Sequence, residues 1–149
     1  MNWQEEHNSA KDYLKQVRLL DIKIDQRIRE KESIRDRAMS VSAVRTDGDK
    51  VQSSGSRETF EHLIAKVADM ESEIDNMIDR FVDLKHKVIG EIQSLEDPRY
   101  VEVLYLKYIE YMRLEEVSCT MKKTNGDSYS YEHIRWLHGE ALKEFWKIL

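Results

Sequence analysis

The side chains best suited to recognition chemistry lie near the carboxyl end of the chain, in a run that begins at Ser130. The apolar residues of this run are spaced three, four and one apart, which predicts a helix with one buried face: Ile134, Leu137, Ala141 and Leu142. The opposite face carries groups that form hydrogen bonds or stack on flat rings: Tyr131, Glu132, Arg135, Trp136 and His138. Because an α-helix fits the major groove of DNA, such a face can contact base edges and the sugar-phosphate backbone.

No residues in the sequence have the spacing of a catalytic or metal site. His133 and His138 are five apart, so they fall on different faces of a helix and are not expected to share a metal ion. Glu115 and Glu116 are adjacent and point apart, which excludes a paired-carboxylate site. The single cysteine, Cys119, excludes an internal disulfide and is expected to be a small buried residue. Without a phosphate-binding glycine loop or a nucleophile elbow, we expect neither an enzyme nor a cofactor.

Several short helices are expected to position the run that begins at Ser130. Asp97 is a good N-cap and Pro98 suits the first helical position, so a helix is predicted near 98–108. A second is predicted near 114–121, and Ser130 is expected to cap a last helix that ends near residue 148. A supporting helix, a scaffold helix and a final helix with a polar outer face form the pattern of a helix-turn-helix domain, which we place at 96–149.

Two long helices are predicted before this domain, over residues 1–95. From Ala10 to Val41, eight of ten heptad positions are apolar, and from Phe60 to Leu95 ten of eleven are. The segment 42–57 loses this period and collects Gly, Ser and Asp, so a flexible loop is predicted there. The sequence therefore predicts a long, antiparallel, coiled-coil-like hairpin.

The heptad pattern also carries information about partners. Ser9 is the expected N-cap of the first helix. Arg27 and Lys31 interrupt the apolar stripe of this helix, but the aliphatic parts of their side chains are expected to cover the seam. Further apolar residues fall at the e position: Leu14, Ile28, Ile64, Ile78 and Ile92. A stripe of this width suits a bundle of more than two helices. We expect dimerisation of the hairpin, and packing of the C-terminal domain on the hairpin is the alternative.

Composition agrees with an all-α protein and excludes some classes of partner. Of the 149 residues, 40% are hydrophobic and 36% charged, with five glycines and one proline. The net charge of −5 supplies no general attraction to nucleic acid or to an anionic membrane. No signal peptide and no apolar run long enough to span a bilayer is recognisable, so we expect a protein of the bacterial host cytoplasm.

The C-terminal run resembles a known family of DNA-binding domains. Residues 130–145, SYEHIRWLHGEALKEF, look like the recognition helix of the sigma-factor region-four domain. The segments 114–117, LEEV, and 103–108, VLYLKY, resemble its scaffold helix and the helix before it. Together with the long N-terminal hairpin, this ending resembles the small phage proteins of the ArpU and RinA group, which are late-transcription regulators.

The resemblance implies roles for individual residues. Tyr131, Glu132, Arg135 and Trp136 occupy the positions that read bases, and the set expected to bind DNA also includes His133 and His138. Ser130 corresponds to the capping position near a phosphate, and Lys143 to a contact with the DNA backbone.

Two features depart from the family pattern. About six additional residues, 122–127, lie between the scaffold and recognition helices and enlarge the turn. Residues 96–149 contain eight Lys or Arg against ten Asp or Glu, whereas phosphate contacts normally dominate affinity for DNA. A dimer, or a partner such as RNA polymerase, is therefore expected to supply part of the binding free energy.

These observations favour a phage- or prophage-encoded transcription regulator that binds double-stranded DNA as a homodimer. Two alternatives stay open. One is a phage packaging or assembly adaptor that contains a helix-turn-helix. The other is a protein-only module that binds RNA polymerase or a sigma factor, which the acidic balance of residues 96–149 would favour.

Overall fold

The structure, a computed structural model, describes residues 2–46 and 59–149. Within these ranges the chain is helical and holds no strand longer than an isolated bridge, so the expected all-α class is confirmed for them. The elements follow one another as α1 (Trp3–Thr46), α2 (Phe60–Gln93), α3 (Pro98–Leu104), the π-helical turn η1 (Tyr105–Ile109), α4 (Leu114–Thr120) and α5 (Tyr131–Ile148). No helix in the two described ranges is long and apolar enough to cross a membrane.

Helix α1 begins earlier than predicted because a reciprocal cap forms at its start. The backbone N–H of Glu5 donates to Oδ1 of Asn2 at 3.0 Å, and the N–H of Asn2 donates to Oε2 of Glu5 at 3.2 Å. The expected cap, Ser9, is inside the helix, where its hydroxyl donates to the carbonyl of Glu5 at 2.8 Å. The helix continues through residue 46, so the loop predicted over 42–57 starts too early; residues 47–57 lie outside the described residues.

The chain forms two compact units. The first comprises Met1–Leu20 together with Phe81–Leu149, and the second comprises Asp21–Arg80. The domain boundary predicted between residues 95 and 96 falls inside the first unit. This grouping arises because the start of α1 and the end of α2 contribute to the same buried cluster as α3, α4 and α5.

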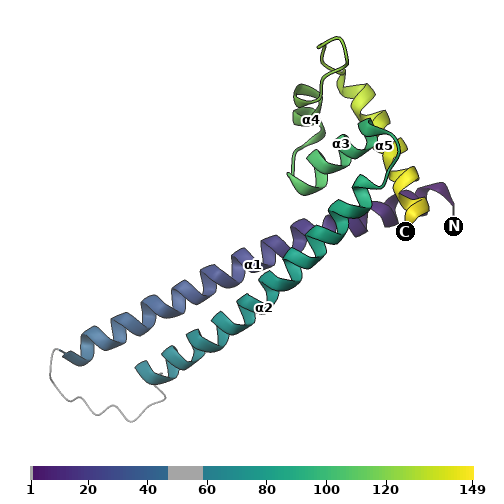
Figure 1. The fold of residues 1–149 in the computed structure, drawn as a ribbon. Helices are drawn as coiled ribbons and strands as arrows, with labels where there is room; N and C mark the ends of the chain where they lie inside the picture. Colours follow the sequence, from purple (N-terminus) through teal and green to yellow (C-terminus); the bar gives the residue numbers. More distant parts are fainter. Residues whose placement is uncertain (1, 47–58) are drawn as a thin grey trace. The chain divides into compact units, whose positions relative to one another are not determined.

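In the second unit, residues 21–46 of α1 and 60–80 of α2 lie side by side and run in opposite directions (Figure 1). The buried side chains of this unit all come from the predicted heptad stripes: Ile24, Ala38, Leu63, Val67, Met70, Ile74 and Met77. Burial at heptad spacing is the pattern by which two long helices cover each other's apolar faces. The use of this segment as a coiled-coil oligomerisation arm stays a prediction.

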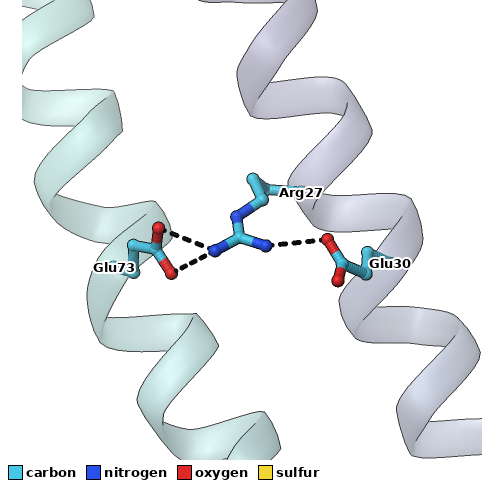
Figure 2. Close-up of polar contacts among 3 residues, drawn as sticks. All are labelled: Arg27, Glu30 and Glu73. Carbon is cyan, nitrogen blue, oxygen red and sulfur yellow. Dashed lines mark hydrogen bonds and ion pairs between the residues drawn. The ribbon is translucent and has the colours of Figure 1, made fainter.

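An ion-pair network occupies the place where Arg27 interrupts the stripe of α1 (Figure 2). One terminal nitrogen of Arg27 donates to both carboxylate oxygens of Glu73, at 2.8 and 2.7 Å, and the other donates to Glu30 at 2.8 Å. These two carboxylates, with Glu73 the stronger, raise the pKa of the Arg27 guanidinium. A second pair, Arg35 with Glu71, also joins α1 to α2. Charged side chains therefore fix the pairing of the two segments where apolar contacts are interrupted.

In the first unit, α5 packs on α3 and α4 around a shared apolar core. Asp97 caps α3 as predicted, because its side chain accepts from the N–H of Arg99 at 2.9 Å and Pro98 occupies the first turn. The predicted stripe of α5 is confirmed, since these residues are fully buried together with Phe145: Ile134, Leu137, Ala141 and Leu142. Buried side chains from α1 and α2 complete this core: Ala10, Leu14, Val17, Val88 and Ile92.

The helix predicted over 98–108 is two elements. After α3 the backbone widens into η1, which ends where the N–H of Glu110 donates to the carbonyl of Tyr105 at 3.1 Å. Tyr111 then takes a left-handed conformation with φ of 61°, which no helix continues, and Met112 starts the connection to α4. A π-helical turn rotates the residues after it relative to an α-helix, and this turn carries Lys107 and Tyr108.

Candidate nucleic-acid interface

The start of α5 is built as the sequence predicts. Ser130 is the N-cap, and its hydroxyl accepts from the N–H of His133 at 3.2 Å. The side chains on either side of Ile134 then turn away from the core, because that residue is fully buried. The cap therefore fixes both the first residue of the helix and the direction in which its first two turns project.

The additional residues between α4 and α5 fold back on themselves. The N–H of Lys123 donates to the carbonyl of Asp127 at 2.8 Å, and Lys122 and Ser128 form an isolated antiparallel bridge. The reversal requires Gly126, which has φ of +87°. The enlarged turn is thus a short hairpin that returns the chain to Ser130.

Four of the predicted site residues form an exposed face on the first two turns of α5. Tyr131 is 41% exposed and Trp136 is 53% exposed, and Glu132 and Arg135 are exposed beside them. The guanidinium of Arg135 lies 5.9 Å from the centre of the Tyr131 ring. We name Tyr131, Glu132, Arg135 and Trp136 the α5 face. A cation next to flat rings on an exposed helix can contact phosphates and stack on bases.

A row of stacked rings continues from the α5 face toward the preceding loop. His133 is half-buried, with its ring centre 5.5 Å from that of Trp136 and 5.3 Å from that of Tyr129. The rings of Tyr129 and His133 are nearly parallel, at 2°, and the ammonium group of Lys123 lies 5.7 Å from the centre of the Tyr129 ring. This stacking restricts the orientation of the rings at the start of α5.

The predicted place of His138 on the exposed face of α5 is wrong, because the residue is buried. The residue is only 6% exposed, and its Nε2 lies 2.7 Å from the hydroxyl of Tyr108. Because successive residues turn by about 100° around a helix, position 138 faces the same side as the buried Ile134 and Ala141. Burial, and after it the charge of Lys11, lowers the pKa of His138 to about 3.

Lys143 lies farther along α5 than the exposed face. Its ammonium group pairs with Glu140 at 3.0 Å and lies 5.3 Å from the centre of the Trp3 ring. A contact of Lys143 with the DNA backbone stays a prediction. Cys119, expected to be buried, is exposed on α4, because only Val117 of that helix turns fully into the core.

A cavity of about 500 Å³ adjoins the α5 face, and sequence reasoning missed it. Arg135 and Trp136 belong to both its lining and the face, while most of its other side chains come from α1 and η1. The missed residues are Trp3, His7, Lys11, Lys15 and Lys107. A spacing of four between Lys11 and Lys15 places both on one side of α1, but charge pairs of this kind are common on solvated helices. The cavity forms where α1 approaches α5. The residues of the two helices that line it are about 120 positions apart in the sequence.

Within residues 2–46 and 59–149, no group of three or more His, Cys, Asp or Glu side chains is arranged to hold a metal ion. The site therefore consists of an exposed helical face with aromatic and basic side chains and a neighbouring cavity lined with lysines. Comparison of the chain with protein-family models, with curated proteins and with solved structures finds no match.

Proposed function

We propose that the chain binds double-stranded DNA through the α5 face and regulates transcription. The observation that supports this most strongly is the exposure of Tyr131, Arg135 and Trp136 on the first two turns of a capped helix. Recognition helices contact bases with their N-terminal turns, so these positions are those that a groove would meet. The likeness of residues 130–145 to a sigma region-four recognition helix narrows the proposal to a late-gene regulator of a phage or prophage.

The packing of the short helices supports a helix-turn-helix. α4 contacts α5 and contributes Val117 to the core, while its glutamates stay exposed. The hairpin turn of residues 122–128 projects between the two helices without entering the core, since its side chains are exposed. A short scaffold helix followed by a longer helix with a free outer face is the arrangement that a groove-binding domain needs.

The proposal includes a homodimer, because the charge of one chain is unfavourable for binding a polyanion. Apolar side chains that stay partly exposed in the second unit support self-association: Ile22 at 43%, Met39 at 53% and Ile78 at 39% exposure. Two recognition helices in one particle double the number of phosphate and base contacts, and the second site binds at a high effective concentration.

Fluorescence anisotropy tests this function directly. Labelled duplexes from the region upstream of late genes are titrated with the full chain at low salt and at increasing salt. We expect binding that weakens steeply with salt and is lost in Arg135→Ala. The matched control is Lys147→Ala, which removes an exposed cation from the far end of the same helix. Absence of binding to every duplex at low salt, with the wild-type chain folded and oligomeric, would contradict the proposal.

A second candidate is a module that binds RNA polymerase or a sigma factor without contacting DNA. The acidic excess of residues 96–149 favours it. Capture of polymerase on the immobilised chain after nuclease treatment, sensitive to Trp136→Ala but without any measurable affinity for duplex DNA, would select this function instead.

A further inference from the structure

The cavity beside α5 concentrates positive charge from three separate elements. Lys11 and Lys15 come from α1, Lys107 from η1 and Arg135 from α5. Only one of the side chains in its lining is acidic, Glu140, and this carboxylate pairs with Lys143 at 3.0 Å. With both histidines of the lining neutral, the cavity has an excess of three positive charges in a chain whose net charge is −5.

The lysines of the cavity are not neutralised by the protein. Across the residues that the structure describes, no carboxylate lies within ion-pair distance of Lys11, Lys15 or Lys107. Five of the nine basic side chains elsewhere in the same unit do have such a partner, as Lys87 has Glu91 and Lys147 has Glu144. Like charges that lie close together repel each other, and an anion that binds among them reduces this repulsion.

Burial and the neighbouring positive charges both act on the pKa values of groups around the cavity. Burial, followed by the charges of Lys15, Lys11 and Arg18, lowers the pKa of Lys107. Burial and then Lys11 and Lys143 lower the pKa of His7. Among the groups that face Lys107, the carboxylate of Glu115 acts in the opposite direction but is the weakest influence. The positive charges around the cavity therefore disfavour a further cation and favour an anion at this position.

A polar atom in the lining also lacks a partner. Nδ1 of His7 is buried and forms no hydrogen bond. On the opposite side of the same lining, Gly139 leaves its position unfilled, since a Cβ built there would come no closer than 4.0 Å to Nε2 of His7. Unsatisfied buried polar atoms are uncommon in proteins and mark places that a ligand or water completes.

The size and the aromatic side chains of the cavity indicate what an occupant carries besides negative charge. A volume of about 500 Å³ is larger than a phosphate group needs and falls in the range of small-molecule sites. Trp3 and Trp136 line it and are both about half exposed, so flat surfaces are available next to the cations. Lysines that neutralise a phosphate and tryptophans that stack on a base are the complement of a nucleotide.

We propose that this cavity is a phosphate-binding site, in which Lys11, Lys15 and Lys107 hold the phosphate group of a nucleotide beside the two tryptophans. The nucleotide is either a unit of a DNA strand or a free small molecule. The site shares Arg135 and Trp136 with the α5 face, but the lysines that define it come from α1 and η1.

Calorimetric titration of the full chain with pyrophosphate and with AMP tests the site. We expect both to bind and to raise the unfolding temperature, since a ligand of the folded state stabilises it. Lys107→Gln should weaken both by about tenfold or more, because it removes one of the charges on the phosphate. In buffer without phosphate the same variant should unfold at a higher temperature than the wild type, since the substitution relieves repulsion.

Lys147→Gln is the matched control: it changes the net charge equally, and Lys147 lies outside the lining of the cavity.

Competition identifies the source of the phosphate. If duplex DNA displaces AMP, the site takes a phosphate of the DNA backbone; if the duplex fails to displace AMP or to bind at all, the site takes a free nucleotide. No binding of pyrophosphate or AMP at millimolar concentration, or equal weakening by Lys107→Gln and Lys147→Gln, would overturn the proposal. Failure of Arg135→Ala to affect duplex binding, with AMP still bound, would instead count against the function assigned to the α5 face.

Discussion

The hydroxyl of Tyr108 and Nε2 of His138 lie 2.7 Å apart and join η1 to α5 inside the first unit. Both side chains are buried, at 4% and 6% exposure, so this hydrogen bond is sheltered from water. The tautomer of His138 decides which of the two atoms donates. The pair fixes the orientation of α5 relative to the turn that carries Lys107, and hence the geometry of the cavity.

The burial of His138 predicts a loss of stability in acid. Its pKa is lowered to about 3, below the ordinary value of 6.5, so the unfolded chain binds this proton more readily than the folded chain. The contribution is fully present above pH 6.5 and is lost as pH falls toward 3, at up to about 1.4 kcal/mol for each pH unit. Denaturant unfolding at pH 7, 5 and 4 measures this slope.

His138→Gln separates this residue from the carboxylates that titrate in the same range. Glutamine keeps a polar group near Tyr108 but has no charge to gain, so the variant should show a flatter dependence of stability on pH. Parallel slopes for the variant and the wild type would show that His138 contributes nothing to acid sensitivity.

Substitution of Phe145 should lower stability far more than substitution of Trp136, although both are aromatic residues of α5. Phe145 is fully buried, and Phe145→Ala should lower the free energy of unfolding by about 3–5 kcal/mol. Trp136 is 53% exposed, and Trp136→Ala should change stability by no more than about 0.5 kcal/mol while it weakens DNA binding. Urea unfolding and anisotropy on the same two variants give the comparison. A strong destabilisation by Trp136→Ala would assign that side chain to the core.

The network of Arg27 predicts how charge controls the pairing of α1 with α2 in the second unit. Arg27→Glu places like charges opposite Glu73 and should lower the unfolding temperature. The double variant Arg27→Glu with Glu73→Arg restores the attraction and should recover part of the loss. Thermal unfolding followed by circular dichroism measures both, and raised salt should reduce the difference between them. An additive loss in the double variant would mean that these two side chains do not interact in solution.

The part of the fold that follows from local spacing was predictable. Ser130 as a cap, the buried Ile134 and Leu137, and the Asp97–Pro98 start of α3 each depend on residues a few positions apart. The four residues of the α5 face were also predictable, because side chains opposite a buried stripe are expected to be exposed.

The features that depend on distant contacts were not predictable. The burial of His138 involves residues far away in the sequence, because its Nε2 lies 2.7 Å from the hydroxyl of Tyr108 and its ring lies 6.3 Å from that of His7. The cavity joins Lys11 to Lys107 in the same way, and a single sequence carries no signal for such an approach. The π-helical turn was not predictable either, since the sequence of residues 98–108 has an unbroken helical pattern.

The indole N–H signals of the three tryptophans report on recognition of DNA by α5, in a nitrogen–proton spectrum of the full chain titrated with duplex DNA at low salt. If the outer side of α5 binds the duplex, the Trp136 signal shifts as DNA is added and returns as salt is added, whereas the signal of the half-buried Trp146 stays in place. Tryptophan-to-phenylalanine variants assign the signals. A duplex that binds while Trp136 stays unperturbed, or that does not bind at all, would contradict the claim that the outer side of α5 recognises DNA.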